Sequence, residues 1–155
     1  EAVRWYRSAA EQGDVVAHFN LGNIYLQGRG VRQNHKEAFS WYRSAAEQGH
    51  ADAQFDLGYI YYEGKRVEQS HKEALRLWRS AAEQGYVGAQ VNLGIMFEQG
   101  KGVAQSHAEA LRWYRPAAEL GHADAQFYLG IMYRHGNAVE KNQKKALRWI
   151  RSGRA

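Results

Sequence analysis

The chain has 155 residues and a formal net charge of +5. Its apolar content of 45% and aromatic content of 13% are those of a protein that packs a core, which argues against an intrinsically disordered chain. It contains no cysteine, which excludes disulfides and thiolate metal sites. No apolar run approaches about 18 residues, so we expect no transmembrane segment.

The positive charge is concentrated at the C-terminal end. Residues 1–133 hold 14 Lys and Arg against 15 Asp and Glu, whereas residues 134–155 hold seven cations against Glu140 alone. Only this end is therefore a candidate for contact with an anionic partner. The seven cations are Arg134, Lys141, Lys144, Lys145, Arg148, Arg151 and Arg154.

One 13-residue motif, EAFSWYRSAAEQG at Glu37, recurs along the sequence. Its copies recur at a fixed interval of 36 residues. An interval of this size is typical of a solenoid built from stacked helical units. The chain opens midway through a repeat and without Met, so we expect it to be a fragment. The related copies begin 36 residues apart, at Glu1, Glu73, Glu109 and, in a degraded form, Lys145.

The first helix of each unit is predicted from apolar residues at i, i+4, i+7 and i+8, such as Ala53, Leu57, Ile60 and Tyr61. A glycine follows the Leu in every copy. Because Gly costs about 1 kcal/mol relative to Ala inside a helix, we expect a neighbouring helix to approach too closely there for a Cβ. A second glycine is predicted to end the helix in the left-handed conformation. The two sets are Gly22, Gly58, Gly94, Gly130 and Gly28, Gly64, Gly100, Gly136.

The second helix is predicted to begin at a capping box such as Asn34-x-x-Glu37, in which the Glu side chain reaches back to the cap. Pro116, inside one copy, is expected to remove the hydrogen bond to the Arg112 carbonyl. The other boxes start at Ser70 and Ser106, and Asn142 keeps only the cap. The buried face of this helix is predicted to include Trp5, Trp41, Trp113 or Trp149, and Trp78 one place further on.

Short connections between these helices predict antiparallel hairpins that pack in a row. We predict one all-α solenoid domain over residues 1–155, as a monomer, with a leading half-repeat and four repeats. The last helix replaces the paired alanines with Gly153 and Arg154, as a polar capping helix would. The half-repeat is 1–13, and the repeats are 14–49, 50–85, 86–121 and 122–155.

The pattern A-x-x-x-L-G-x-x-Y-x-x-G-x-G-V followed by A-x-x-W-Y-x-x-A-A-x-x-G resembles the Sel-one-like repeat family, a relative of the tetratricopeptide repeats. The resemblance covers nearly the whole chain. It implies a right-handed α–α superhelix that serves as an adaptor for protein complexes, without catalysis. The alanine-rich, glycine-punctuated sequence looks bacterial. A cysteine-rich subgroup carries a disulfide in each repeat, and this chain departs from it.

One face of the first helix is predicted to remain free of packing. Its residues differ between copies, whereas the packing positions barely change, and the resemblance places this face in a concave groove. It is partly acidic, carries Tyr and Ile, and has no Lys or Arg, which favours a peptide or partner helix with apolar anchors and some positive charge. The alternative is a polar face without a ligand. The fourteen positions, called the variable face below, are Asn20, Asn23, Gln27, Asp52, Asp56, Tyr59, Glu63, Asn92, Ile95, Gln99, Asp124, Tyr128, Ile131 and His135.

Other chemistry is not favoured. His35, His71 and His107 recur one repeat apart, about 10 Å in a helical stack, which is too far to share a metal ion. We therefore expect no catalytic residues, no metal and no cofactor. Arg7, Arg43, Arg79 and Arg115 each precede a Glu by four residues, so we expect intrahelical ion pairs. Nucleic acid or an anionic envelope surface, met by the basic C-terminal end, is the alternative partner. The sequence does not fix the compartment.

Overall fold

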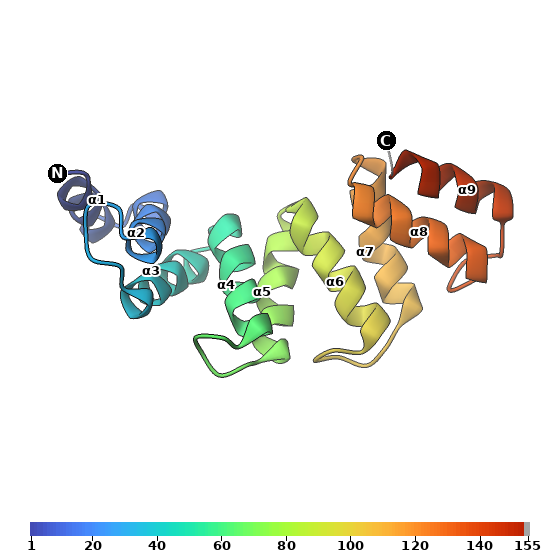
Figure 1. The fold of residues 1–155 in the computed structure, drawn as a ribbon, viewed down its shortest axis with the longest axis horizontal. Helices are drawn as coiled ribbons and strands as arrows, with labels where there is room; N and C mark the ends of the chain where they lie inside the picture. Colours follow the sequence, from blue (N-terminus) through green and yellow to red (C-terminus); the bar gives the residue numbers. More distant parts are fainter. Residues whose placement is uncertain (154–155) are drawn as a thin grey trace. The chain divides into compact units, whose positions relative to one another are not determined.

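The computed structural model describes residues 1–153 and contains nine α-helices and no strand within that range. This confirms the all-α repeat fold (Figure 1). The helices are α1 (Ala2–Glu11), α2 (Val15–Gln27), α3 (His35–Glu47), α4 (Ala51–Glu63), α5 (His71–Glu83), α6 (Val87–Gln99), α7 (His107–Glu119), α8 (Ala123–His135) and α9 (Gln143–Ser152).

The helices form two compact units, Glu1–Gln84 and a second that begins at Gly85. In the first unit, α1 packs on α2, and the hairpins α2–α3 and α4–α5 meet where α3 contacts α4. In the second, the hairpins α6–α7 and α8–α9 meet where α7 contacts α8. Within each unit, consecutive hairpins thus pack against each other, as the 36-residue interval predicts.

The caps that begin the second helices are present, but the boxes are only half formed. The Asn34 side chain accepts hydrogen bonds from the N–H groups of Lys36 and Glu37, at 3.1 and 3.2 Å. The Asn34 N–H, however, donates to the Tyr25 carbonyl at 2.9 Å rather than to the Glu37 side chain. The prediction of a reciprocal box is therefore wrong, because the preceding helix supplies the acceptor. The same exchange ties Ser70 to Tyr61, Ser106 to Phe97 and Asn142 to Tyr133.

The first helices end at glycines in the left-handed conformation, as predicted. Gly28 has φ 69° and Gly64 has φ 65°, values that favour glycine. A glutamine five residues later reinforces this end. The Gln33 side-chain amide donates to the Leu26 carbonyl at 2.7 Å, and Gln69 donates to the Tyr62 carbonyl at 2.8 Å. Gln105 makes the same bond to Glu98 in the third repeat, so the loops are held by side chains as well as by the turn.

The mid-helix glycines mark close crossings, which confirms the prediction. A Cβ on Gly22 would lie 2.8 Å from Cδ1 of Tyr42, on the partner helix of the same hairpin. Gly58 faces the Trp78 ring in the same way. The indole N–H of Trp78 donates to the Phe55 carbonyl at 3.0 Å, which fixes the ring in place. In the first three repeats the glycine thus makes room for a buried aromatic ring on the partner helix, and at Gly130 it makes room for Ile150.

Successive hairpins are joined by a buried amide. The Gln54 side chain is 5% exposed and donates to the Ala46 carbonyl at 3.1 Å, from α4 to α3. Gln126 makes the equivalent bond to Ala118, also at 3.1 Å, from α8 to α7. Both bonds reach a carbonyl in the last turn of the preceding helix, which has no intrahelical partner of its own.

Trp5 does not lie on a buried face, contrary to the prediction. Its side chain is 76% exposed, whereas the equivalent Trp41 is partly buried, with its ring 5.5 Å from the His18 ring. His18 belongs to α2, the helix that precedes α3 in its hairpin. Within residues 1–153, Trp5 makes no comparable ring contact.

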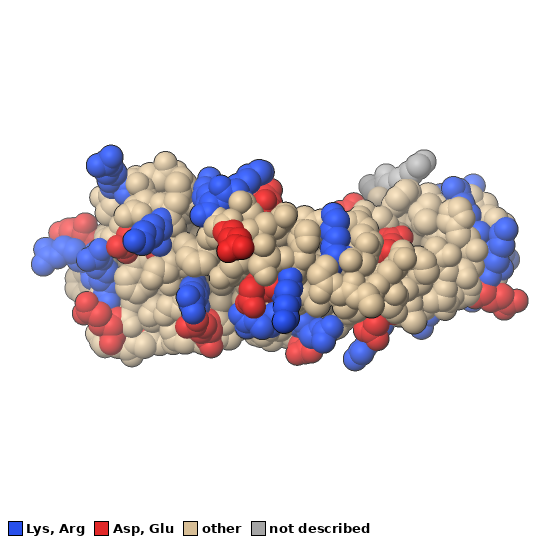
Figure 2. Space-filling view, turned by 90° about the horizontal axis from the view of Figure 1, so that it is seen from below, with Lys and Arg blue, Asp and Glu red and all other residues tan. Residues whose placement is uncertain are grey.

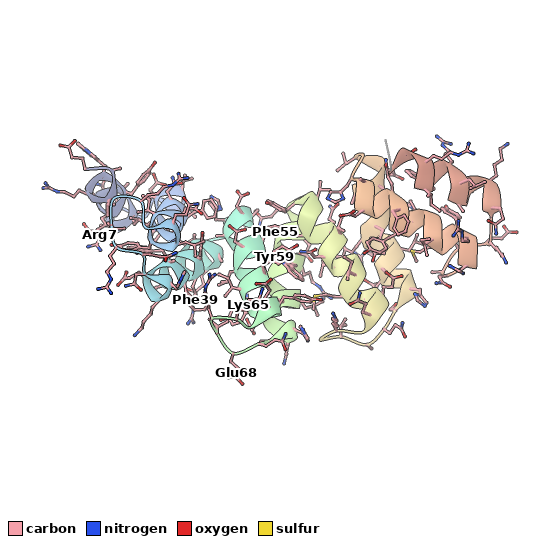
Figure 3. The ribbon with its side chains drawn as sticks, in the orientation of Figure 1. Arg7, Phe39, Phe55, Tyr59, Lys65 and Glu68 are labelled. Carbon is pink, nitrogen blue, oxygen red and sulfur yellow. The ribbon has the colours of Figure 1, made fainter. Side chains whose placement is uncertain are left out.

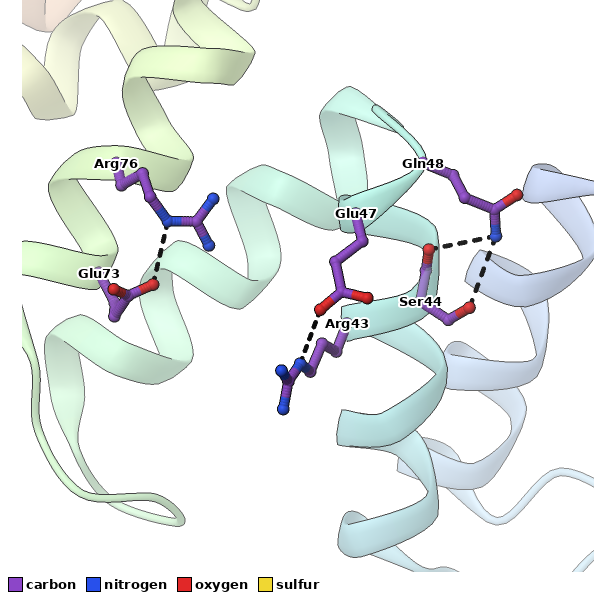
Figure 4. A network of polar contacts seen from close by, with 6 residues as sticks. All are labelled: Arg43, Ser44, Glu47, Gln48, Glu73 and Arg76. Carbon is purple, nitrogen blue, oxygen red and sulfur yellow. Dashed lines mark hydrogen bonds and ion pairs between the residues drawn. The ribbon is translucent and has the colours of Figure 1, made fainter.

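The predicted Arg–Glu pairs form only in part. Arg43 and Glu47 meet at 2.8 Å (Figure 4), but Arg7 donates to the Tyr25 hydroxyl, and no ion pair joins Arg115 to Glu119. Other pairs span three residues, as in Arg76–Glu73 at 3.1 Å. Both side chains of the Arg43–Glu47 pair and of the Arg76–Glu73 pair are exposed, so each pair contributes at most about 1 kcal/mol.

Candidate partner-binding face

The variable face of the first unit lies on α2 and α4. None of its seven residues is buried. Gln27, Asp52, Tyr59 and Glu63 are exposed, and Asn20, Asn23 and Asp56 are partly buried. Two of them make polar contacts within the chain. The Tyr42 hydroxyl donates a hydrogen bond to Asn23 at 2.7 Å, and Lys65 forms an ion pair with Glu63 at 3.1 Å.

A pocket of about 360 Å³ opens on this face between α2 and α4. We call it the Asp56 pocket. Tyr42 of α3 contributes to its lining, and Tyr59 stands at it with 42% of its surface exposed. The pocket therefore combines ring surfaces and a carboxylate at positions of the variable face. It is lined by Asn23, Leu26, Tyr42, Asp56, Tyr59, Ile60, Glu63, Lys65 and Arg66.

The pocket corrects the prediction of a face without cations. Lys65 and Arg66 come from the loop after α4, where Gly64 turns the chain back toward the helix. Figure 3 shows Lys65 just after the end of α4, the helix that carries Tyr59. A helical wheel assigns faces only within a helix, and for this reason the contribution of the loop was missed.

A second cavity of about 520 Å³ adjoins the first and is mainly apolar. The two share Leu26, Tyr42, Ile60 and Arg66 in their linings. We call the second cavity the Phe39 cavity, after the ring that α3 contributes (Figure 3). Val67, from the loop after α4, also lines it. Its remaining lining is His35, Lys36 and Ala38.

The Asp56 carboxylate is poorly compensated. Its burial, and secondarily the neighbouring carboxylate of Asp52, raise the pKa of Asp56 to about 6 from 3.8. Burial of the Tyr42 hydroxyl and, secondarily, the Asp56 carboxylate raise the pKa of Tyr42 to about 12. No hydrogen bond or ion pair joins the Asp56 side chain to another residue in the range 1–153.

Replacing Asp56 with asparagine should make the protein more stable at neutral pH. Because the pKa is raised on folding, the folded state holds this proton more tightly, so ionisation opposes folding. The penalty is absent below about pH 4 and complete above about pH 6. We expect Asp56→Asn to gain roughly 1–2 kcal/mol at about pH 7, after allowance for partial exposure, and almost nothing at about pH 4. Urea unfolding at both values measures it.

The exposed Asp52→Asn variant serves as the control for this measurement. Asp52 lies one turn earlier on the same helix and loses the same charge, but it is exposed. We expect a smaller gain from it, through relief of repulsion alone. An equal gain from Asp56→Asn at both pH values would contradict the electrostatic explanation.

The variable face of the second unit is less open. Asn92, Ile95, Tyr128 and Ile131 are partly buried, and Gln99, Asp124 and His135 are exposed. The Tyr128 ring stacks on Tyr114 with centroids 5.0 Å apart and an angle of 14°. Burial raises the pKa of Tyr114, and its hydroxyl donates to Glu98 at 2.8 Å. Tyr128 is therefore a packed ring with one free face.

A family model of the Sel1 repeat matches this chain at residues 1–14, 15–50, 51–86, 87–122 and 123–153. The chain belongs to the Sel1 repeat family. Sel1 repeat proteins are generally scaffolds for protein–protein interaction.

Solved Sel1 repeat proteins share this structure. A Sel1 repeat protein from Oxalobacter formigenes is 39% identical, with a TM-score of 0.91 over 98% of this chain and 63% of its own. A protective antigen present in uropathogenic Escherichia coli strains is 34% identical, with a TM-score of 0.91 over 98% of this chain and 32% of its own. An uncharacterized Neisseria meningitidis protein is 50% identical over 38 residues, 24% of this chain and 8% of that protein.

The Sel1 repeats hold no recognisable metal centre within the described residues. No group of three or more His, Asp or Glu side chains is arranged there to bind an ion. None of the helices in residues 1–153 is long and apolar enough to cross a bilayer.

The last Sel1 repeat exposes the basic residues that the sequence singled out. Lys and Arg side chains gather at the end of the molecule that carries α9 (Figure 2). Within the described residues none of them pairs with a carboxylate. Lys145 instead lies 5.4 Å from the Tyr133 ring centre. Arg154 lies outside the described residues. The exposed cations are Arg134, Lys141, Lys144, Lys145, Arg148 and Arg151.

Proposed function

We propose that this Sel1 repeat protein is a non-catalytic scaffold that binds a peptide or partner helix on the variable face. The observation that carries the proposal is that none of the fourteen positions is buried, whereas packing positions of the same helices, such as Ala53 and Leu57, lie in the core. Residues that differ between repeats and are not needed for packing are available for recognition.

The chemistry of the face suggests the kind of partner. Tyr59 offers an exposed ring held edge-on by Phe55 at 5.1 Å and by Trp78 at 5.3 Å. Rigid aromatic side chains of this kind are common anchors at interfaces because they lose little conformational freedom on binding. The adjacent carboxylates favour a partner with apolar anchors and positive charge.

Tyr59→Ala should weaken capture of the partner about tenfold, the loss typical of an interface anchor near 1.4 kcal/mol. The ring is largely outside the core, so folding should be retained. Crosslinking in the source cell, followed by pull-down and quantitative mass spectrometry, measures capture. Tyr128→Ala, on the second unit, extends the test to the other part of the variable face.

Tyr6→Ala is a suitable comparison, since it removes a partly buried tyrosine from α1, away from the variable face. Circular dichroism verifies the fold of each variant. Capture that is unchanged in the double variant Tyr59→Ala/Tyr128→Ala would refute binding through the variable face.

Binding of an anionic polymer through α9 is the second candidate, favoured by its exposed and unpaired cations. Duplex DNA serves as the probe in fluorescence anisotropy. If six phosphates are contacted, affinity should fall about 10³-fold between roughly 50 and 200 mM salt. The triple variant Lys144→Gln/Arg148→Gln/Arg151→Gln should then reduce the slope of log affinity against log salt by roughly three.

Arg43→Gln/Arg76→Gln/Arg112→Gln provides the matched control. It removes three cations that each have a glutamate partner within 4.0 Å. We expect this variant to keep the salt slope of the wild type. The absence of binding at low salt would dismiss α9 as a site for anionic polymers.

A further inference from the structure

We propose that the Asp56 pocket binds an arginine side chain of the partner, and that the Phe39 cavity receives an apolar side chain next to it. This inference rests on the proposed function and specifies what the first unit recognises. It concerns only α2, α3, α4 and the loop after α4, which belong to one compact unit.

The two carboxylates of the Asp56 pocket differ in whether they have a cationic partner. Glu63 already has a cation, Lys65, at 3.1 Å, whereas the Asp56 carboxylate has no partner within the described chain. Its pKa is raised by burial and by Asp52, and neither Lys65 nor Arg66 offsets these effects. A partly buried carboxylate in this condition gains most from an incoming cation, because the cation replaces lost solvation.

Aromatic and apolar side chains surround the Asp56 carboxylate in this pocket. Tyr42 and Tyr59 line the same pocket, together with Leu26 and Ile60. A guanidinium is planar, binds a carboxylate through two parallel N–H groups and stacks on aromatic rings, whereas an ammonium does neither as well. The lining therefore suits arginine better than lysine.

The Asp56 pocket and the Phe39 cavity lie next to each other. Leu26 and Ile60 lie in both linings, so two side chains of one ligand can occupy the two cavities side by side. The second cavity adds the Phe39 ring and Val67, surfaces that bury an apolar side chain. Its lining also includes His35 and Lys36, which the Asp56 pocket lacks and which would oppose a second cation there. The charge pattern thus fixes one basic and one apolar anchor.

Selection from a random twelve-residue peptide display library on the immobilised full chain tests this inference. We expect enriched peptides to contain Arg beside an aliphatic or aromatic residue. In a synthetic copy, Arg→Gln should weaken binding about tenfold, as expected for loss of a charged hydrogen bond, and Arg→Lys should weaken it less. Fluorescence anisotropy measures the affinities.

A double-mutant cycle identifies the protein partner of that arginine. On Asp56→Asn, the peptide change Arg→Gln should cost less than about twofold, because the carboxylate is already gone. On Glu119→Gln, an exposed glutamate of α7 that lies outside the variable face, it should still cost about tenfold. Circular dichroism and thermal melting confirm that both variants fold.

The outcomes separate this inference from the proposed function. Enriched peptides that lack Arg, or an Arg→Gln effect that is equal on wild type and Asp56→Asn, would overturn the arginine site and leave peptide binding intact. If no peptide is enriched, the arginine site falls together with peptide binding by the variable face.

Discussion

Gly94→Ala should lower the free energy of unfolding by about 3 kcal/mol. A Cβ at this position would lie within 3.0 Å of ring atoms of Tyr114. The ring cannot easily yield, because Tyr114 is fully buried and its hydroxyl is bonded to Glu98 at 2.8 Å. Intrinsic propensity alone predicts the opposite, a gain of about 1 kcal/mol from alanine. The sign of the change in urea unfolding therefore decides between crowding and propensity.

Gly88→Ala is the matched control, with the same substitution on the same helix. The equivalent positions in other repeats, Val16, Asp52 and Asp124, carry exposed side chains. We expect Gly88→Ala to be neutral or to gain up to about 1 kcal/mol. A stabilising effect of Gly94→Ala would show that α6 and α7 do not cross as closely as described.

Pro116→Ser should raise the free energy of unfolding by about 2 kcal/mol. The helix α7 runs from His107 to Glu119 without interruption, although Pro116 lies inside it. Proline there cannot donate to the Arg112 carbonyl, and proline inside a helix costs about 3 kcal/mol relative to alanine. The gain is smaller than this cost because serine is a weaker helix former and loses some ring contact. Thermal and urea unfolding measure the change.

The reciprocal substitution Ser44→Pro tests the same argument in α3, at the equivalent position of an earlier repeat. The Ser44 carbonyl and hydroxyl accept hydrogen bonds from the Gln48 amide, at 3.2 and 3.5 Å (Figure 4). Ser44→Pro should cost about 3 kcal/mol. If both substitutions leave stability unchanged, the helix tolerates proline near its last turn, and the explanation is wrong.

Local sequence signals predicted the helices and their ends well. The caps at Asn34 and Ser70 and the left-handed glycines at Gly28 and Gly64 depend on residues close in the chain, whose geometry is fixed by the helix itself. The crossing at Gly58 was also predicted, because a costly residue repeated at one position has a packing reason. Its partner, Trp78, could be seen only in the structure.

Contacts between helices account for what the sequence did not predict. The Asn34 N–H bonds to Tyr25, so the box with Glu37 stays open. The Gln33 bond to Leu26 also joins residues that a single-helix analysis treats separately. A signal was present, since a glutamine precedes the cap residue in three repeats.

The accessibility of the variable face was predicted, but the shape of the pocket on it was not. The wheel placed Asp56 and Tyr59 on a free face, and the structure leaves both accessible. The cavity between them depends on Tyr42 from α3 and on Arg66 from a loop. A periodic pattern carries no information on which loop residue folds back onto which helix, and the second cavity beside Phe39 was missed for the same reason.

The amide bonds from Gln54 to Ala46 and from Gln126 to Ala118 have a consequence for how such chains change length. Both use the same donor, the same acceptor and the same separation of eight residues. Duplication or loss of 36 residues therefore recreates an interface between hairpins that the protein already contains, and no new core packing is needed. Recombination within the gene can extend or shorten the array in whole steps, while point mutations diversify what each added step presents to a partner.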